Sequence, residues 1–232
     1  MENESIYTRT EQMLGAEATE RLRSARIIVF GVGGVGGFAT EALVRAGICD
    51  ISVVDADTVA PSNLNRQIIA THSTLGMSKV DAIMQRIVDI NPEARVTVHN
   101  LFFSEETVPV FDFSSYDYVL DCIDSVRSKL TLIECAIKAG TPIISAMGAG
   151  NKLDPTRFTV TDISKTHTDP LSRVIRGELR RRGIEHLKVV FSPEEPINPG
   201  GKRTPGSISF VPSVMGLIMA GEVIKEVAGR DS

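Results

Sequence analysis

The sequence predicts an α/β fold with a doubly wound, mostly parallel sheet of the Rossmann type. Short β-branched runs alternate with amphipathic helix patterns between residues 26 and 145, and this alternation is typical of parallel sheets with helices on both faces. A glycine-rich turn over 31–37 follows the first run directly and leads into a helix pattern. With 232 residues, 42% of them hydrophobic, the chain is long enough for one such domain with some elaboration.

The expected elements follow in order along the first 150 residues. Strands are expected over 26–30, 51–54, 95–98, 118–120 and 142–145. Helices are expected over about 35–46, 76–90 and 126–139. Apolar residues at a period near 3.6 support the second helix, and Asn91-Pro92 ends it. Gly47 and Gly140 follow the other two helices, at the position where helix C-caps are common.

The alternation changes after Gly150, so we expect a single domain with a core over 1–150 and a C-terminal elaboration over 151–232. Its expected elements are strands over 157–161 and 188–191, a basic helix over 170–183 and a Pro/Gly-rich loop over 193–206. The apolar segment 211–227 contains Glu222, Lys225 and Glu226, charges that a membrane span avoids. We expect a buried or subunit-interface helix there, with a membrane-associated helix as the less favoured alternative.

Composition excludes several classes of protein. The net charge of −4 gives no global attraction to nucleic acid or anionic lipid, so any RNA contact must use a local basic patch. The three cysteines, Cys49, Cys122 and Cys135, form no C-x-x-C pair, which disfavours a structural zinc site. A low, odd number of cysteines is typical of a reducing compartment. The chain also starts with polar residues and has no apolar signal core there, so we expect a cytoplasmic protein.

The glycine turn predicts a site for nucleotide phosphates. Its glycines, Gly31, Gly33, Gly34 and Gly36, let backbone N–H groups approach an anion at a helix N-terminus. Asp55 ends the second strand 24 positions after Gly31, where an acidic residue of dinucleotide folds binds a ribose hydroxyl. We therefore interpret Asp55 as a ribose ligand in preference to a solvated strand-end carboxylate.

The next polar segment, 57–67, favours a triphosphate. It contains Asp57, Asn63 and Arg66, and the planar guanidinium of Arg66 is suited to phosphate oxygens. Taken alone, the segment is better explained as a solvated turn. Lys79 stands in the first turn of a helix, where a cation is unfavourable unless an anion neutralises it; phosphate and solvent remain equal alternatives.

Two carboxylates follow the strand over 118–120, at the edge where such sheets bind ligands. Asp124 is the better magnesium ligand because it lies further into the loop, whereas a cap of the next turn is the alternative for Asp121. A nicotinamide site needs neither a metal ligand nor this many cations. The glycine turn, the ribose carboxylate, the two cationic side chains and the metal ligand together suit attack on the α-phosphate of ATP, with pyrophosphate as the leaving group.

These motifs resemble the adenylation domain of the ubiquitin-activating-like superfamily, which includes the activators of thiamine and molybdopterin synthesis. The residues that carry the resemblance are Gly31–Gly36, Asp55-Ala56-Asp57, Asn63–Gln67, Lys79 and Asp124. Further matches extend it over nearly the whole chain toward the family of tRNA threonylcarbamoyladenosine dehydratases. They are Asp121–Lys129, Gly148–Thr156, Val160–Thr166, Asp169-Pro170-Leu171 and Phe191–Pro196.

The resemblance implies an enzyme that activates the carboxylate of threonylcarbamoyladenosine in tRNA with ATP and Mg²⁺ and then closes a ring, with net loss of water. It implies a homodimer in which Arg9 reaches the partner's ATP, although a solvated terminus is the alternative for Arg9. It places Arg66, Lys79, Asp124 and Arg9 in the catalytic machinery. A monovalent cation and a sulfur-handling partner protein are left open.

The residues after 138 include no cysteine, which argues against thioester chemistry. An adenylating activator of a ubiquitin-like sulfur-carrier protein remains the alternative, since a free adenylate needs no cysteine, and a non-catalytic nucleotide-binding module is a third hypothesis. Contact with tRNA is expected at a basic cluster, although a solvated face is an equal alternative. The cluster contains Arg173, Arg176, Arg180, Arg181 and Arg182, with Lys188, Lys202 and Arg203 nearby.

Overall fold

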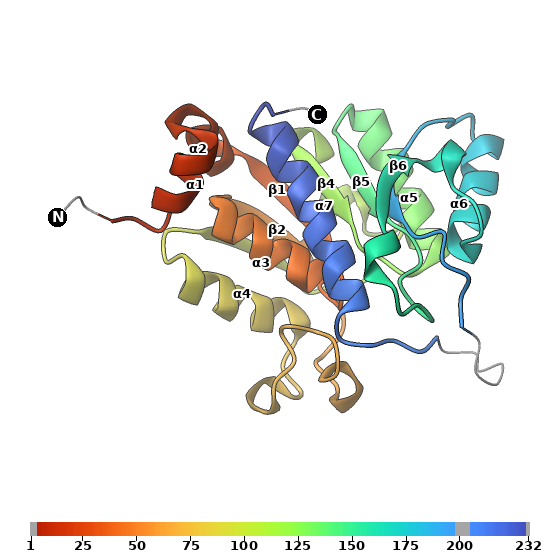
Figure 1. Cartoon of the computed structure of the whole chain (residues 1–232), viewed down its shortest axis with the longest axis horizontal. Helices are drawn as coiled ribbons and strands as arrows, with labels where there is room; N and C mark the ends of the chain where they lie inside the picture. The colour runs from red at the N-terminus through yellow and green to blue at the C-terminus, as the bar shows by residue number, and fades with distance from the viewer. Residues whose placement is uncertain (1–3, 198–204, 231–232) are drawn as a thin grey trace.

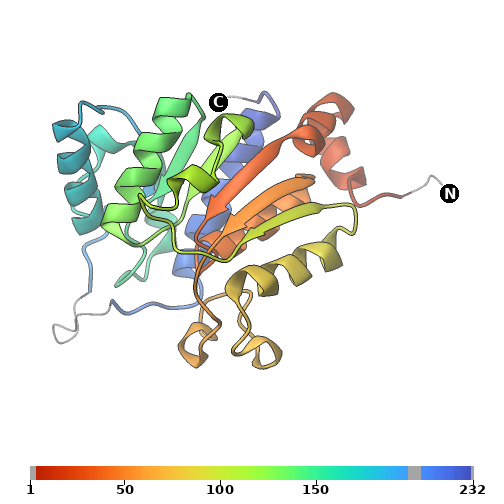
Figure 2. The same ribbon diagram turned by 180° about the vertical axis from the view of Figure 1, so that it is seen from behind.

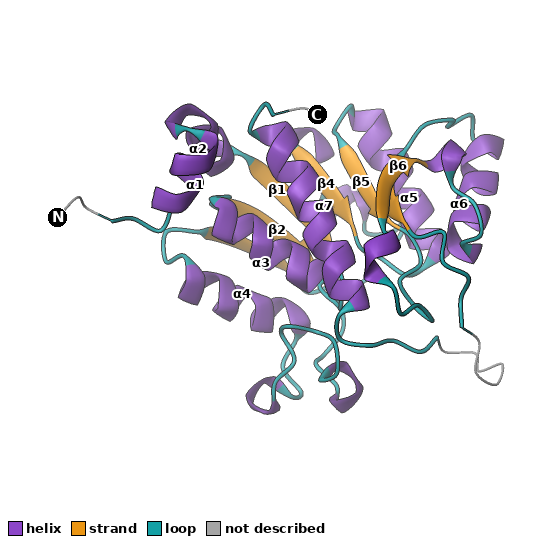
Figure 3. Cartoon of the chain, viewed as in Figure 1, coloured by secondary structure: helices purple, strands orange, loops and turns teal. Residues whose placement is uncertain are grey.

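A computed structural model describes residues 4–197 and 205–230 as a layered α/β structure (Figures 1 and 3). Seven strands form one sheet in the order β3-β2-β1-β4-β5-β7-β6. Their bounds are β1 Arg26–Phe30, β2 Asp50–Val54, β3 Arg95–His99, β4 Tyr118–Asp121, β5 Ile143–Ala146, β6 Thr159–Asp162 and β7 Lys188–Phe191. All neighbouring pairs are parallel except β6 and β7.

Helices cover both faces of this sheet. Their bounds are α1 Thr8–Leu14, α2 Ala16–Ser24, α3 Gly36–Ala46, α4 Lys79–Ile90, α5 Val126–Ala139, α6 Pro170–Arg181 and α7 Val211–Val227. Helices α3, α4 and α7 lie in front of the sheet in Figure 1, and α5 and α6 lie behind it, as Figure 2 shows. Side chains alternate accordingly, since Ile27 and Val29 pack with the front helices and Ile28 and Phe30 with the back ones.

The strand order creates one switch point. From β1 the chain runs outward to β2 and β3, then returns to place β4 and β5 on the other side of β1. The carboxyl ends of β1 and β4 therefore border the crevice where open α/β sheets bind ligands. The glycine turn follows β1, and Asp124 follows β4.

The predicted fold class is confirmed, with shifts at the ends of some elements. Helix α4 begins at Lys79 rather than near 76, because the side chain of Ser78 accepts a hydrogen bond from the Asp81 N–H and caps it. Strands β6 and β7, from the expected elaboration, join the sheet beside β5. The division at residue 150 stays a prediction.

Helix α7 packs closely on α3, as expected for a buried helix. A Cβ on Gly216 would stand 2.2 Å from the Val35 carbonyl oxygen, so the two helices approach as only glycine allows. Leu217 remains 49% exposed on the opposite side of α7. Among the described helices, none has the length and apolar character needed to cross a membrane.

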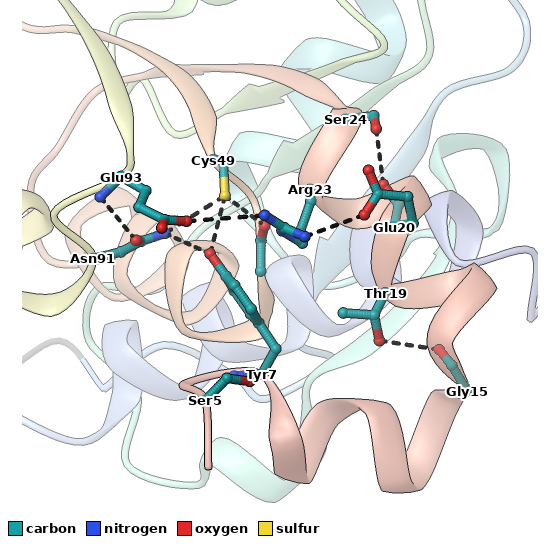
Figure 4. Close-up of polar contacts among 11 residues, drawn as sticks. Ser5, Tyr7, Gly15, Thr19, Glu20, Arg23, Ser24, Cys49, Asn91 and Glu93 are labelled. Atoms are coloured by element: carbon teal, nitrogen blue, oxygen red, sulfur yellow. Dashed lines mark hydrogen bonds and ion pairs between the residues drawn. The ribbon is translucent and has the colours of Figure 1, made fainter. Parts of the chain in front are cut away.

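The two N-terminal helices were not predicted from the sequence. Helix α1 is held through Tyr7, just before it, whose hydroxyl lies 3.2 Å from Cys49 Sγ and accepts a hydrogen bond from the Asn91 side chain at 3.1 Å (Figure 4). The guanidinium carbon of Arg23 stands 4.9 Å from the centre of the Tyr7 ring. These contacts join α1 and α2 to the amino end of the sheet, where β2 and β3 begin.

Candidate functional site

The turn after β1 requires glycine at two positions. Gly31 has a φ of +85°, and a Cβ there would stand 2.8 Å from the Cys122 carbonyl oxygen. A Cβ on Gly36 would stand 1.8 Å from the Gly31 carbonyl oxygen, so the chain doubles back too tightly for any side chain. No side chain caps the N-terminus of α3, which is fully described. The Gly37 N–H donates to the Gly33 carbonyl at 3.0 Å, and the other first-turn N–H groups can bind an anion.

Asp55 connects β2 to the glycine turn. Its Oδ2 accepts a hydrogen bond from the Val32 N–H at 2.9 Å, and its Oδ1 accepts one from the Asp57 N–H at 2.9 Å. Lys79 Nζ lies 2.6 Å from Asp57 Oδ2 and 3.9 Å from Asp55 Oδ1. The anion that neutralises Lys79 in this structure is thus a carboxylate, although the sequence suggested phosphate or solvent. The roles of all three side chains toward a ligand stay predictions.

Arg66 lies against the glycine turn and has no acidic partner among the described residues. Its Cγ is 3.5 Å from the point where a Cβ of Gly34 would stand. Its guanidinium donates to the Ser62 carbonyl and to Asn65 Oδ1, each at 2.9 Å. These contacts hold Arg66 in place while its charge remains available for phosphate.

Asn63 lies largely buried in the same loop. Its Oδ1 accepts a hydrogen bond from the Ala60 N–H at 2.9 Å, which closes the turn over 60–63. The neighbouring Asn65 is exposed, and its amide nitrogen donates to the Ser207 carbonyl at 3.0 Å. Asn63 therefore shapes the loop that carries Arg66, and a direct contact with ATP stays a prediction.

The two carboxylates after β4 have different environments. Asp121 is fully buried and accepts hydrogen bonds from Lys129 Nζ at 2.7 Å and Ser145 Oγ at 2.5 Å. Asp124 is exposed and makes no hydrogen bond or ion pair to the described residues. The Asp121 carboxylate is thus already paired, and the role of Asp124 as a metal ligand stays a prediction.

The cysteine nearest the site does not have the environment of a nucleophile. Burial raises the pKa of the Cys122 thiol strongly, and the nearby Asp121 carboxylate raises it further. Burial also raises the pKa of Cys135 on α5. A thiolate is the reactive form of cysteine, so both residues are poor nucleophiles near neutral pH. This agrees with chemistry that proceeds without a thioester.

Comparisons with known proteins identify the family of this chain. A model described as the ThiF family matches residues 7–232. The chain belongs to the ThiF family. It is 44% identical to the tRNA threonylcarbamoyladenosine dehydratase of Bacillus subtilis over 238 residues, which cover 95% of this chain and 94% of that protein. The resemblance inferred from the sequence motifs is confirmed.

Solved structures extend the comparison to the fold. Structures of Escherichia coli tRNA N6-threonylcarbamoyladenosine dehydratase in complex with AMP and with ATP each align with a TM-score of 0.90 and 35% identity. The alignments cover 97% of this chain and 94% of the other. This ThiF-family chain therefore shares its architecture with an enzyme that binds ATP.

Arg9 lies far from the glycine turn of its own chain. It is exposed on α1, and α2 leads directly into Arg26, the first residue of β1. The glycine turn follows the other end of that five-residue strand, a separation of about 17 Å along the strand. Arg9 therefore does not contribute to the site of its own chain, and its role in a partner's site stays a prediction.

The arginines of α6 are less available than the sequence suggested. Arg176 donates to the Thr166 carbonyl at 2.7 Å, Arg181 pairs with Glu178, and Arg182 lies 2.8 Å from Glu134 Oε1. Arg173 and Arg180 are exposed and have no acidic partner among the described residues. Lys202 and Arg203 lie outside the described residues, and Lys188 pairs with Glu222 and Glu226.

The orientation of α6 separates these arginines. The helix starts at the carboxyl edge, where its N-cap Asp169 contacts Gly148 just after β5. Residues 182–187 then lead to the first residue of β7, at the opposite edge. Arg173 thus lies toward the candidate site, and Arg180–Arg182 lie about 10–14 Å further along the helix axis.

Sequence reasoning missed a second buried ion pair. Lys152 Nζ lies 2.8 Å from Asp169 Oδ1, and both side chains are 1% exposed. Burial alone raises the pKa of Asp169, but Lys152 and hydrogen bonds from Ser172 outweigh it and hold that pKa below its usual range. The pair fixes the loop after β5 to the start of α6.

Proposed function

We propose that this chain catalyses the ATP-dependent dehydration of threonylcarbamoyladenosine in tRNA. Similarity to dehydratases over nearly its whole length supports this function, together with the ATP and AMP complexes of the Escherichia coli relative. The observation that carries the proposal is the set of groups at the switch point. The glycine turn, the uncapped N-terminus of α3, Arg66 and Asp124 all follow strand ends at this switch point, and Asp124 has no partner among the residues that the structure describes.

The reaction has two steps that balance. A carboxylate oxygen of the substrate attacks the α-phosphorus of ATP, and pyrophosphate leaves. The carbamoyl nitrogen then attacks the activated carbonyl carbon and loses its proton, and AMP leaves with the former carboxylate oxygen. The base has lost one water, while ATP has become AMP and pyrophosphate. Because the nitrogen and carbonyl belong to one molecule, positioning by the protein supplies much of the acceleration.

The residues divide these tasks. The glycine turn and the N-terminus of α3 bind the phosphates, Asp55 binds the ribose, and Arg66 neutralises charge on the phosphoryl oxygens. Lys79 joins them by exchanging part of its contact with Asp57 for phosphate.

The chemistry of Asp124 fits Mg²⁺, which binds through one or two carboxylates plus substrate phosphates. When bound, the ion withdraws charge from the phosphoryl oxygens and the departing pyrophosphate. No group of three or more His, Cys, Asp or Glu side chains gathers into a metal site among the described residues, so Asp124 would share the ion with ATP.

The decisive experiment is mass spectrometry of nucleosides from tRNA incubated with this protein and ATP. The expected product is threonylcarbamoyladenosine lighter by one water, formed with AMP and pyrophosphate. Unchanged tRNA nucleosides under all conditions that bind ATP would reject the proposal. Pyrophosphate exchange that depends on a small carrier protein and ignores tRNA would establish the alternative, an activator of a sulfur carrier.

A homodimer would explain Arg9, which is exposed and remote from its own site. In this arrangement the Arg9 guanidinium of each subunit neutralises the triphosphate of the other. Arg9→Ala and Asp124→Asn are each expected to lose most activity, whereas a mixture of the two regains part of it in mixed dimers. No recovery in the mixture would reject a contribution from the partner subunit.

The tRNA would lie across the carboxyl edge and the exposed side of α6. Arg173 and Arg180 have no acidic partner within 4–197 and 205–230. Their double change to Glu is therefore expected to weaken tRNA binding and reduce the salt dependence by about two phosphate contacts. The same changes at the paired Arg181 and Arg182 are expected to have less effect. If all variants bind tRNA equally well, α6 does not contribute to tRNA binding.

A further inference from the structure

Helix α1 buries none of its own residues, and Tyr7 is the one buried residue within 4–17. A helix of seven residues is too short to be stable alone in water. Leu14 packs partly against the core at the end that leads to α2. The other end of α1, where Arg9 lies, is therefore held in place through the side chain of Tyr7.

Tyr7 inserts between two segments that lead into the sheet. Its ring carbon Cδ1 lies 3.6 Å from the point where a Cβ of Gly47 would stand. Its hydroxyl accepts a hydrogen bond from Asn91 Nδ2 at 3.1 Å and lies 3.2 Å from Cys49 Sγ (Figure 4). Gly47 and Cys49 precede β2, and Asn91 precedes β3. The tyrosine thus attaches the start of α1 to both strands.

The outer side of α1 has the composition of a protein interface. Arg9 is exposed and makes no ion pair with residues 4–197 or 205–230. Met13 lies one turn further on the same side and is 83% exposed, and Ile6 before the helix is 57% exposed. Arginine and methionine are enriched where proteins associate. These side chains are therefore suited to contact with a second copy of this chain.

We propose that Tyr7 is a positioning residue, which holds α1 so that Arg9 reaches the triphosphate bound by a second copy of this chain. The inference rests on the proposed homodimer and its use of ATP. Arg9 follows Tyr7 by two residues, so its main chain lies within about 7 Å of the anchored tyrosine. Without this anchor the start of α1 adopts many conformations, and ordering it for each reaction costs free energy.

Tyr7→Ala tests the inference through turnover in the dehydration of tRNA. The variant is expected to fold with reduced stability in urea and to lose about tenfold or more in turnover, because Arg9 is misplaced. The double variant with Arg9→Ala should be no slower than Arg9→Ala alone, since both changes remove the same contact. A further loss in the double variant would contradict this coupling.

Tyr116→Ala is the matched control. The Tyr116 hydroxyl also makes a side-chain hydrogen bond, to Ser52 Oγ at 3.1 Å, but the residue packs with the core behind the sheet. Its loss is expected to leave the turnover of the folded protein unchanged. An equal loss of turnover in both variants would mean that general destabilisation explains the effect, and would overturn the inference.

Mixed dimers give a readout that a merely structural role would not produce. When Tyr7→Ala is co-expressed with Asp124→Asn, the well-placed Arg9 of the second subunit serves the intact site of the first, so part of the turnover should return. When Tyr7→Ala is co-expressed with Arg9→Ala, neither site receives a well-placed Arg9, so no turnover should return. The reverse pattern would mean that Tyr7 acts within its own subunit and would overturn the inference.

The outcomes separate this inference from the proposed function. Wild-type protein that does not dehydrate tRNA would overturn both. An active wild type with Tyr7→Ala within about twofold of its turnover would overturn only the role of Tyr7. If Tyr7→Ala does not fold, Tyr7→Phe keeps the ring and removes the hydroxyl. It is expected to lose about twofold to tenfold, as for one hydrogen bond, and wild-type turnover would overturn the inference.

Discussion

The carboxyl edge of the sheet carries two groups of polar side chains with opposite arrangements. After β4 and β5, Lys129 is satisfied by Asp121, Ser145 and the Ala146 carbonyl, and Lys152 by Asp169 and the Gly148 carbonyl. Around the glycine turn Asp55 and Lys79 are also paired, but other polar groups are not. Arg66 and Asp124 have no partner of opposite charge among the described residues, and the buried amide of Gln67 has no hydrogen bond there.

This difference distinguishes the polar groups that stabilise the fold from those that remain available to a ligand. A buried charge persists only when the fold supplies its partner, so the pairs after β4 and β5 fix the backbone from which Asp124 projects. Unpaired groups at the crevice reduce stability or leave charge unbalanced, and a ligand of complementary chemistry removes that cost. This comparison predicts large effects on stability at the first group and large effects on ligand binding or turnover at the second.

The largest expected effect is on stability. Lys129→Met leaves the Asp121 carboxylate buried without its cation, and we expect the free energy of unfolding to fall by about 3–5 kcal/mol. Adding Asp121→Asn removes the buried charge and should restore much of the loss. Urea unfolding measures both, with Lys138→Met on the exposed face of α5 as the control. A decrease of less than about 1 kcal/mol in the free energy of unfolding of Lys129→Met would contradict the stabilising role of this pair.

The next effect is on catalysis at the open side. Asp124→Asn is expected to reduce turnover about 100-fold or more, as for the loss of roughly 3 kcal/mol of transition-state charge stabilisation. Because Asp124 is exposed, its free energy of unfolding should stay within about 0.5 kcal/mol of wild type. Turnover is measured over a range of Mg²⁺ concentrations, with the exposed Asp89→Asn as the control. If the turnover of Asp124→Asn depends on Mg²⁺ concentration as in wild type, Asp124 is not the metal ligand.

The smallest expected effect is on the pH dependence of stability. It concerns His99, whose unpaired ring nitrogen lies away from the crevice. Burial lowers the pKa of His99, whose ring lies 4.9 Å from that of Phe111 and whose Nε2 has no hydrogen-bond partner in the described part of the chain. Below the unfolded-state pKa of about 6.5, the unfolded chain takes up a proton that the folded chain resists. The free energy of unfolding should therefore fall as the pH drops from about 6.5 toward the folded-state pKa, by at most about 1.4 kcal/mol per pH unit.

His99→Phe removes the titrating group, so its urea unfolding should lack this part of the pH dependence. ATP binding should not change, because the atom lies in the back-face core and not beside the glycine turn. If the unfolding profiles of wild type and variant run parallel between about pH 5 and pH 7, His99 does not contribute.

Most of the elements were predictable because their signals are local. Gly140 adopts a φ of +73° behind α5, as a C-cap glycine should, and the β-branched runs became strands in the expected order. Helices α1 and α2 were missed because α1 has only seven residues and is held by contacts of Tyr7 with Cys49 and Asn91, far away in the chain.

The site was predictable in its residue types but not in its pairing. Lys129 carried a signal that was overlooked, since it shares the apolar face of α5 with Leu132, Ile133 and Ala136, where a lysine must be buried and paired. Nothing local shows that Asp57 neutralises Lys79, because the two are 22 positions apart. Contacts between distant segments depend on the fold as a whole.

The sequence by itself determined the strand–turn–helix units and placed the polar loops at one edge of a parallel sheet. Periodicity, caps and glycine positions act over a few residues, so they can be recognised without the tertiary structure. Only the tertiary structure decided which charged groups are satisfied within the protein and which face the crevice. That decision depends on burial and on distances between segments far apart in the chain, and these distances exist only once the sheet and its helices have packed together.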